Sequence, residues 1–484
     1  MLNLLLIGLG PHAKRIYYPV SAKNGPQNNF QIVHAIDIET KKDDISSYLK
    51  INGYPEIEIT YLKESQKSTK KLKPEVVDIL NKIAKEKQIN GVIISTEPLA
   101  HVCYAEWALS QGLSVLMDKP ISTRENVVNS LKSVEGIVED YEKLEKAYIK
   151  AKKLNPKIVF SLMAQRRFHP AFIKIKELIK EVFAKTNCPI TSIQSFHSDG
   201  QWRMPSEIVD QIYHPYCQGY GKCSHSGYHS IDIAPWLIEA TETKGKEINN
   251  VDVYSNFLYP KDFLTQLNIE DYKKLFPDFN KSNKYTKKAL LEKYNDYGEI
   301  DAFLSFAFKH NNDTISLGST NLIHNGFAQR NWPSADGRDL YKGNGRVRHE
   351  SHYIEQGPFQ AISYISYQGK EVDPDNLEGV YETGGEYHLD IHIFRNQKMF
   401  PEWKNYEKIT VRDLGSNIME GKSRGHQEDA RRNCILEFAF AVQKGTKVSS
   451  DFLDHKRSTM LFYGAYKSAV LKKMGKNPMI NVTF

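Results

Sequence analysis

The sequence lacks most of the features that would set it apart from ordinary globular proteins. Only 5 of its 484 residues are cysteines, an odd number that suits a reducing compartment better than a disulfide framework. No stretch approaches the roughly 20 apolar residues that span a bilayer. The apolar N-terminus has no cation before Lys14 and is interrupted by Gly8 and Gly10, which is unlike a signal peptide. We therefore expect a cytoplasmic protein without membrane contact.

Charge of one sign is not in large excess either. The chain carries 65 Lys and Arg against 58 Asp and Glu, a net charge of +7. The only short basic cluster, residues 63–73, is typical of a solvated face, so we expect no nucleic-acid partner. Internal repeats and low-complexity linkers are absent from the sequence as well. The length predicts two or three domains with full cores of their own.

The first third of the chain alternates strand-like and helix-like segments. Short apolar or β-branched runs predict strands at Leu2–Ile7, Gln31–Asp37, Gly91–Ser95, Ser114–Met117 and Lys157–Met163. Helical spacing of apolar residues predicts helices at Pro11–Ala22, from Pro74 onward, at His101–Gln111 and at Glu142–Lys153. Buried strands that alternate with helices predict a doubly wound parallel sheet. We therefore expect an α/β Rossmann domain over residues 1–165.

Strands dominate beyond about residue 190. They are expected at 190–198, 251–258, 299–308, 314–323, 359–367, 387–394 and 408–414, with helices near 227–239, 430–444 and 454–473. This order predicts an α+β domain over residues 166–484, built on a large, mostly antiparallel open sheet. Two polar, aromatic-rich stretches, near 260–297 and 325–351, are expected to be insertions.

A glycine-rich turn follows the first predicted strand. Gly8, Gly10 and Ala13 fit the pattern G-x-G-x-x-G/A between a strand and a helix. Glycine allows the tight turn and the close approach of a pyrophosphate, and the helix N-terminus offers N–H groups to that anion. The alternative is an ordinary strand–helix turn. The N-terminal position in an alternating segment favours a dinucleotide site.

Asp37 ends the second predicted strand, where a carboxylate can bind the ribose hydroxyls of the adenosine. A carboxylate repels a 2′-phosphate, so NAD is the expected cofactor. Lys41 and Lys42 follow closely and leave NADP possible. The alternative for Asp37 is a solvated strand end.

Several motifs together resemble the glucose–fructose oxidoreductase/inositol dehydrogenase (Gfo/Idh/MocA) family. They are Ser95 to His101, the Asp118-Lys119-Pro120 segment, Arg167 to Pro170, and Gly219-Tyr220-Gly221 followed by His225 to Asp232. Residues 430–473 are similar more loosely. Two departures stand out: Asp118 replaces the usual Glu, and His225 stands where the family commonly has Asp.

The resemblance implies hydride transfer between a nicotinamide and an alcohol carbon of a sugar, sugar derivative or cyclitol. Lys119 would polarise the oxygen and His229 would act as the base, with His225 as a third catalytic candidate. On one helix, His225, His229 and Asp232 would share a face. The cofactor-binding residues that the motifs imply, beside the glycine turn and Asp37, are Thr96, Pro98, His101, Asp118, Lys119 and Pro120. The substrate-binding candidates are Arg167, His169, Tyr228 and Asp232.

Alternatives remain open at this point. Some proteins resembling the family are NAD-dependent glycosidases, which oxidise the sugar transiently, and others are non-catalytic regulatory proteins. The histidines, with Cys217 and Cys223 upstream, also have a ligand spacing, but a metal site would leave the glycine turn without a role, so no metal is expected. Each candidate has a structural alternative too: a surface lysine for Lys119 and a core histidine for His229. The resemblance further implies a homodimer or homotetramer formed through the C-terminal sheet.

Overall fold

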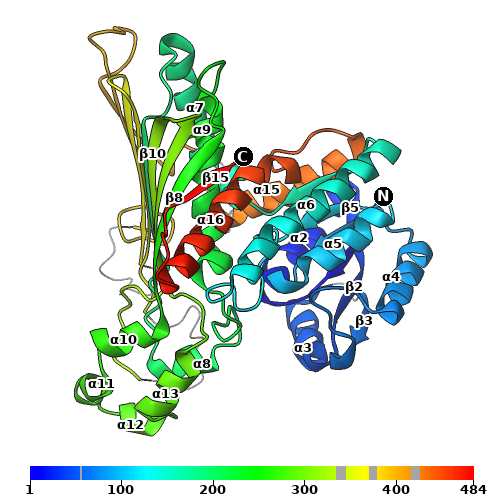
Figure 1. Ribbon diagram of the computed structural model, residues 1–484. Coiled ribbons are helices and arrows are strands. Elements are labelled where there is room, and N and C mark those ends of the chain that lie inside the picture. Colours follow the sequence, from blue (N-terminus) through cyan, green and yellow to red (C-terminus); the bar gives the residue numbers. More distant parts are fainter. Residues whose placement is uncertain (55–56, 334–344, 370–378, 416–425) are drawn as a thin grey trace. The chain divides into compact units, whose positions relative to one another are not determined.

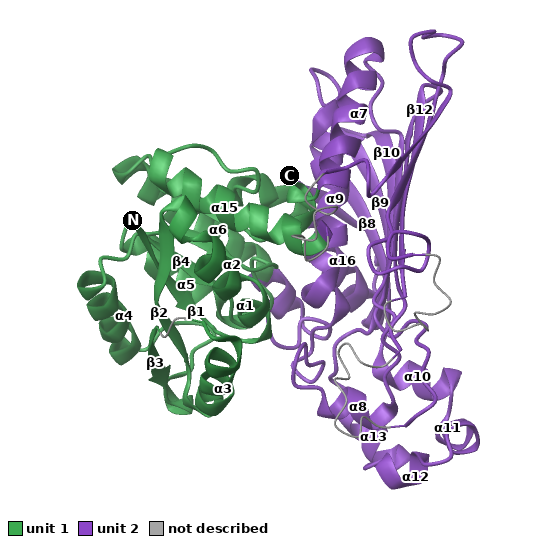
Figure 2. Ribbon diagram, turned by 180° about the vertical axis from the view of Figure 1, so that it is seen from behind, with its two compact units in different colours: residues 1–123, 137–169, 427–459 green, residues 124–136, 170–426, 460–484 purple. Residues whose placement is uncertain are grey.

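The computed structural model describes residues 1–54, 57–333, 345–369, 379–415 and 426–484 (Figure 1). The chain divides into two units (Figure 2). Unit 1 comprises residues 1–123, 137–169 and 427–459, and unit 2 comprises residues 124–136, 170–426 and 460–484. The sequence predicted one division after residue 165. In the structure, residues 427–459 also pack within unit 1, and residues 124–136 pack within unit 2.

Unit 1 is built on a six-stranded parallel sheet in the order β3-β2-β1-β4-β5-β6. The strands are β1 Leu2–Ile7, β2 Phe30–Ile38, β3 Glu58–Leu62, β4 Gly91–Ile94, β5 Ser114–Met117 and β6 Phe160–Leu162. This order is that of the Rossmann fold, whose strand order reverses beside the first strand. The expected doubly wound α/β sheet is confirmed.

Helices cover both faces of this sheet. They are α1 Pro11–Arg15, α2 Tyr17–Asn24, α3 Lys42–Asn52, α4 Pro74–Glu86, α5 His101–Ser110, α6 Leu131–Leu154, whose first residues belong to unit 2, and α15 His426–Lys444. The single helix expected over Pro11–Ala22 is divided into α1 and α2 at Ile16, whose φ of −116° is far from the usual helical value. α3 and β3 were not predicted from the sequence.

The apolar side chains of β1 separate into two cores. Leu5 and Ile7 pack in a cluster with α4, α5 and α6. Leu4 and Leu6 pack on the other face, with α2 and with Phe438 of α15. A strand that is buried on both faces carries apolar residues at consecutive positions, and this continuous run identified β1 in the sequence.

Unit 2 contains a nine-stranded sheet in the order β14-β13-β12-β11-β7-β10-β9-β8-β15. Only β7 and β10 pair in parallel. The strands are β7 Ser192–Ser198, β8 Asn250–Leu258, β9 Asp301–His310, β10 Asp313–Ile323, β11 Arg348–Gln356, β12 Gln360–Gln368, β13 Asp390–Arg395, β14 Tyr406–Thr410 and β15 Ile480–Thr483. The expected large, mostly antiparallel sheet is confirmed. β11 lies near its centre, although its first residues fall in the stretch 325–351 that the sequence suggested to be an insertion; residues 334–344 of that stretch lie outside the described residues.

Three long helices, α7 Pro170–Thr186, α9 Tyr228–Ile238 and α16 Lys456–Lys473, lie along one face of the sheet of unit 2 (Figure 1). Phe172 of α7 stacks on Tyr364 of β12, and Ser468 of α16 accepts a hydrogen bond from the backbone of Ser255 in β8. A separate helical lobe contains α8 Pro205–Asp210, α10 Pro260–Gln266, α11 Ile269–Leu275, α12 Phe279–Ser282 and α13 Lys287–Tyr294. Among the described helices, none is both long and apolar enough to cross a bilayer.

Candidate functional site

The glycine turn of unit 1 lies between β1 and α1. Gly8 has a φ of +90°, and a Cβ atom there would lie 2.6 Å from the carbonyl oxygen of Ser95, so the fold itself requires glycine. Gly10 differs, because a Cβ atom there would meet no atom within 4 Å. Gly10 also precedes the first turn of α1 without a side-chain cap. The open space before this helix start fits a pyrophosphate group.

Asp37 stands at the end of β2 beside the glycine turn. Its carboxylate accepts hydrogen bonds from the backbone N–H of Leu9 and of Ile38, both at 2.7 Å. Burial raises the pKa of Asp37, and these two bonds partly offset the rise. The contact with Leu9 fixes the carboxylate directly at the turn, as binding of an adenosine ribose would require.

Asp118 is the centre of a buried polar group at the end of β5. It accepts hydrogen bonds from the hydroxyls of Tyr17 and of Ser95, the latter at 2.8 Å, and His12 lies 3.8 Å away. Burial raises the pKa of Asp118, but these partners outweigh it and bring the net pKa below its usual value. The carboxylate is therefore an anchored anion, and Lys119 follows it directly at the strand end.

His101 joins the loops that follow β4 and β5. Its imidazole lies 2.8 Å from the carbonyl oxygen of Pro120 and 3.2 Å from that of Thr96. Burial lowers the pKa of His101, and Asp118 and the two carbonyl contacts partly offset the decrease. Pro98 begins the short 3₁₀ segment that leads into α5. His101 thus holds in place the loop that carries Lys119, and its direct contact with a cofactor stays a prediction.

Arg167 and His169 are both buried, in and beside the 3₁₀ segment Gln165–Phe168 of unit 1. The Arg167 guanidinium donates to the carbonyl oxygen of Asp454 at 3.1 Å and lies 3.4 Å from a ring nitrogen of His455. Arg167 therefore holds the segment before α16 in this structure. The expected substrate contacts of Arg167 and His169 stay predictions.

In unit 2, the three polar residues expected on one helical face are divided between two elements. His229 and Asp232 lie on α9, three residues apart and both buried. His225 lies before α9, in the π-helical turn Cys223–Gly227. The expectation of one α-helical face is therefore wrong for His225, because a π-turn is wider than an α-turn and changes the direction of its side chains. Tyr228, a substrate candidate, is fully buried with its ring 5.9 Å from that of Phe462, and its substrate contact stays a prediction.

A buried charged cluster that the sequence did not reveal lies around Asp199, just after β7. Its carboxylate accepts a hydrogen bond from the ammonium group of Lys222, and Arg346 lies 3.5 Å away. Burial raises the pKa of Asp199, but Lys222, the strongest of its charged neighbours, holds the net value well below the usual range. Lys222 directly follows the Gly-Tyr-Gly motif, and this position is the sequence signal that could have identified it as a candidate.

His324 connects this cluster to the helical lobe. It lies 3.9 Å from Asp199, and its two ring nitrogens meet the hydroxyl of Tyr216 and, at 3.1 Å, the amide oxygen of Gln201. Burial lowers the pKa of His324 well below its usual value, so the ring is neutral. The amide oxygen can only accept, so the nitrogen facing Gln201 carries the hydrogen and Tyr216 donates to the other nitrogen. Tyr216 also packs in the core of the lobe.

The Gly219-Tyr220-Gly221 motif is explained by a close crossing of two backbone segments. A Cβ atom on Gly221 would overlap the carbonyl oxygen of Glu299, and one on Gly219 would lie 2.5 Å from the Cα atom of Asn126. Lys222 then donates its N–H to the same Glu299 oxygen at 2.9 Å. The glycines therefore bring the chain close enough to Glu299 to set the start of the π-turn.

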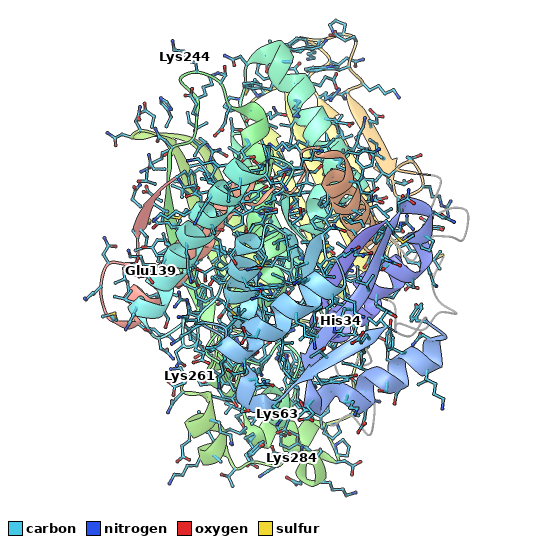
Figure 3. The ribbon with its side chains drawn as sticks, turned by 90° about the vertical axis from the view of Figure 1, so that its right-hand side faces the viewer. His34, Lys63, Glu139, Lys244, Lys261 and Lys284 are labelled. Carbon is cyan, nitrogen blue, oxygen red and sulfur yellow. The ribbon has the colours of Figure 1, made fainter. Side chains whose placement is uncertain are left out.

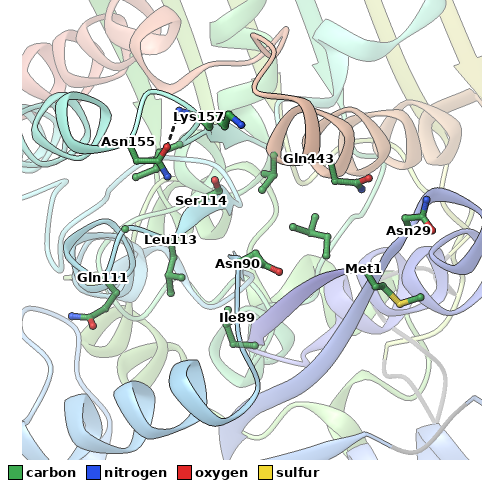
Figure 4. Close-up of a pocket in the computed structure, with 14 residues that line it drawn as sticks. Met1, Asn29, Ile89, Asn90, Gln111, Leu113, Ser114, Asn155, Lys157 and Gln443 are labelled. Carbon is green, nitrogen blue, oxygen red and sulfur yellow. Dashed lines mark hydrogen bonds between the residues drawn. The ribbon is translucent and has the colours of Figure 1, made fainter.

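No group of three or more His, Cys, Asp or Glu side chains among the described residues is arranged to hold a metal ion. A cavity of about 860 Å³ does open in unit 1, but at the opposite edge of the sheet, lined among others by Met1, Asn90, Ser114 and Lys157 (Figure 4). Dinucleotides bind outside the carboxyl ends of parallel strands, whereas this cavity lies at the amino ends. It is therefore not the candidate site.

Strand order, glycine turn and the carboxylate at the end of β2 define unit 1 as a dinucleotide-binding domain. Residues 2–149 match the Gfo/Idh/MocA family, described as an oxidoreductase family with an NAD-binding Rossmann fold. The match confirms the resemblance seen in the sequence and, with it, the prediction of an NAD(P)-dependent oxidoreductase.

Solved structures resemble the whole chain. An oxidoreductase domain protein from Kribbella flavida has a TM-score of 0.57 at 13% identity, covering 98% of this chain and 97% of its own. An oxidoreductase from Agrobacterium radiobacter, in complex with NAD+, L-tartaric acid and magnesium, has a TM-score of 0.56 at 11% identity, covering 100% of this chain and 98% of its own. Levoglucosan dehydrogenase, in complex with NADH and levoglucosan, has a TM-score of 0.54 at 13% identity, covering 99% of each chain. At these identities the likeness shows the fold alone. No curated protein sequence matches the chain.

Proposed function

We propose that the protein transfers a hydride between the nicotinamide of NAD(P) and an alcohol carbon of a sugar, sugar derivative or cyclitol. The observation that carries this proposal is the placement of the glycine turn and of the Asp118-Lys119 pair at the carboxyl ends of β1 and β5, next to the point where the strand order reverses. The levoglucosan complex supports the substrate class, because that protein shares the fold and binds a sugar derivative.

The residues at the turn fit NAD. A Cβ atom on Gly10 would fill the space before α1, and Asp37 presents a fixed carboxylate beside it. When bound, the nicotinamide supplies the atom that accepts or donates the hydride. NAD is preferred to NADP in this proposal, because a carboxylate at the ribose repels a 2′-phosphate.

Within this proposal, the chain's own residues handle the proton and the developing charge. Lys119 stabilises the alkoxide that forms as the alcohol loses its proton. His229 takes the hydroxyl proton, since an imidazole titrates near neutrality. His225 supports that transfer from the adjoining π-turn, and Asp232 orients His229 or binds a substrate hydroxyl.

The test is a titration of the nucleotide-free protein with NADH and NADPH, followed by a panel of sugars and cyclitols. We expect tighter binding of NADH, and turnover of at least one substrate that falls at least about a hundredfold in Lys119→Ala. Lys63→Ala is the matched control, because Lys63 is an exposed lysine after another strand of the same sheet (Figure 3). Binding of neither nucleotide would contradict the proposal. Tightly held NAD without net redox change would favour the glycosidase reading.

We also propose that the protein self-associates through the open face of the sheet of unit 2. The helices cover the other face, whereas this one exposes large apolar side chains: Phe303, Leu317, Tyr353, Tyr367, Phe394 and Tyr406. Strand registers place them on one side; for example, the row that starts at Leu317 continues through Ser192, Glu355 and Ala361 to Phe394. Polar side chains lie among them, and the rings of Phe394 and Tyr406 are in contact at 4.9 Å. Exposed apolar side chains on one sheet face support an interaction site, and a second copy offers the same chemistry.

A further inference from the structure

The π-turn that carries His225 is held from both flanks. π-turns are rare and occur frequently at functional sites. This one spans Cys223–Gly227, with His225 at its centre. Its backbone begins at the close crossing of Gly221 and Glu299 described above. The contacts of its remaining side chains determine how firmly the His225 ring is oriented.

The first flank is closed by a ring of hydrogen bonds around one ion pair. The Lys222 ammonium group donates to Asp199 and, at 2.8 Å, to the hydroxyl of Ser226. Ser226 in turn donates to the same Asp199 oxygen at 3.1 Å. Lys222 and Ser226 lie on either side of His225 in the chain. Asp199 therefore ties together the residues that bracket His225.

The second flank is fixed by Glu299. Its carboxylate accepts a hydrogen bond from the backbone N–H of Cys223 at 2.8 Å and one from the Tyr466 hydroxyl at 3.0 Å. The hydroxyl of Ser224 lies 2.7 Å from that of Tyr466. Cys223 and Ser224 are thus held by Glu299, just before β9, and by Tyr466 of α16.

The His225 ring lies among a group of aromatic and imidazole rings. Ring centroids lie 4.6 Å away for His214, 5.5 Å for Tyr220, 5.6 Å for Tyr216 and 6.4 Å for His324. His214 reaches this position from a left-handed backbone conformation with φ +56°, which is uncommon for a residue other than glycine. Such a conformation persists only where the surroundings determine it.

Stability alone does not explain a fully buried lysine at this place. Burial lowers the pKa of Lys222, and Asp199 partly restores it. The desolvation cost of a buried ion pair commonly cancels its attraction, so an apolar pair of similar size would stabilise the fold as well. The charged pair instead fixes the orientation of the turn, because the Lys222 ammonium group donates to acceptors at fixed positions.

We propose that Lys222 and Asp199 are positioning residues that fix the orientation of His225 for proton transfer. This inference rests on the oxidoreductase function proposed above. The ion pair holds Ser226, Ser226 and Lys222 hold the π-turn, and the π-turn aims the imidazole. Neither Lys222 nor Asp199 is required to touch the substrate.

The experiment uses the full chain with Lys222→Met, Asp199→Asn and the double variant. The double variant removes both charges of the Lys222–Asp199 pair, and Arg346, which is partly exposed, keeps its hydrogen bond to the backbone oxygen of residue 199 at 2.7 Å. Histidine-selective NMR labelling, with the resonance of His225 assigned from His225→Gln, follows the titration of the ring. We expect the double variant to keep its NADH affinity while the His225 midpoint moves by at least about 0.5 pH unit. We expect kcat to fall by about tenfold or more with little change in KM.

Two further variants keep the outcome decisive. Ser226→Ala leaves the ion pair intact and should move the His225 midpoint in the same direction by less. Lys309→Met with Asp252→Asn removes an ion pair from β8 and β9 of the same unit and should leave His225 unchanged. An unaltered His225 titration in both the double variant and Ser226→Ala overturns the proposal, whatever happens to thermal stability. The NMR result stands even when no substrate is turned over, so failure of the proposed function is distinguished from failure of this inference.

Discussion

Gly221 and Glu299 approach so closely that a side chain at residue 221 would overlap the Glu299 carbonyl oxygen. Gly221→Ala must therefore push the two backbone segments apart. We expect a loss of about 2–4 kcal/mol in the free energy of unfolding, measured by urea denaturation. Gly10→Ala is the control, since a Cβ atom there meets nothing within 4 Å. Equal stability of the two variants would show that the crossing relaxes freely.

The same Gly10→Ala variant tests the nucleotide site. Because its Cβ atom would occupy only the open space before α1, the variant should fold as the parent does and lose affinity for NADH by at least about tenfold. Tryptophan-to-NADH energy transfer measures the binding. Undiminished affinity would place the pyrophosphate elsewhere.

Asp37→Asn keeps the shape of the side chain at the end of β2 and removes its charge. The amide oxygen can still accept from Leu9, whereas the amide nitrogen then faces the N–H of Ile38, so one of the two hydrogen bonds is lost. We expect NADH to bind about tenfold more weakly and NADPH to gain relative to NADH, since the repulsion of a 2′-phosphate is gone. Titrations with both nucleotides give the ratio of affinities. If that ratio does not change, Asp37 does not select the cofactor.

Glu299 links stability to pH. Burial raises its pKa from 4.5 to about 7, so the folded state binds the proton more tightly than the unfolded chain does. Its contribution to stability is therefore complete below pH 4.5 and is lost as the pH rises through about 7. Between pH 5 and pH 8 the free energy of unfolding should therefore fall by about 2–3 kcal/mol more in the parent than in Glu299→Gln. Urea denaturation at both pH values measures the difference.

The matched control for that measurement is Glu270→Gln, which alters an exposed glutamate of α11. Asp301, whose pKa burial raises to about 6, titrates in the same direction and remains in every variant. The difference between the parent and Glu299→Gln therefore isolates Glu299. Identical pH dependence in the parent and in both variants would contradict the assignment.

The open sheet face should determine the assembly state. Leu317→Lys combined with Phe394→Lys places charges on the row that crosses the sheet, and we expect the mass in solution to drop to that of one chain. Size-exclusion chromatography with light scattering measures it. Leu275→Lys, on an equally exposed leucine of the helical lobe, should leave the mass unchanged. A monomeric parent protein would refute self-association.

Strands whose side chains are apolar on both faces could be predicted from the sequence almost to the residue, as β1 and β5 show. β11 could not, because Ile354 is its one apolar inward side chain, and the other three, Glu350, His352 and Gln356, are polar, buried and paired within unit 2. A hydrophobic period is invisible when the buried positions carry polar groups.

The candidate site divides in the same way. The glycine turn and the Asp118-Lys119 pair are local patterns, and the sequence predicted their place at the strand ends. Asp199 and Lys222 become neighbours only through the tertiary fold, and no local sequence pattern near either residue predicts their pairing. The shared α-helical face expected for His225 is not found, because spacing alone does not distinguish a π-turn from an α-turn.

Helix α15 places Ala430, Cys434 and Phe438 against the sheet that begins at Leu2. A ribosome has therefore synthesised nearly the whole protein before one face of the nucleotide-binding unit can be covered. Until then the part of that face that α2 and α3 do not cover is exposed apolar surface on a nascent chain, the kind of surface that chaperones bind and that aggregates when it is left uncovered. Premature termination before α15 should accordingly yield no soluble fragment able to bind the nucleotide, even though every residue of the glycine turn has already been made.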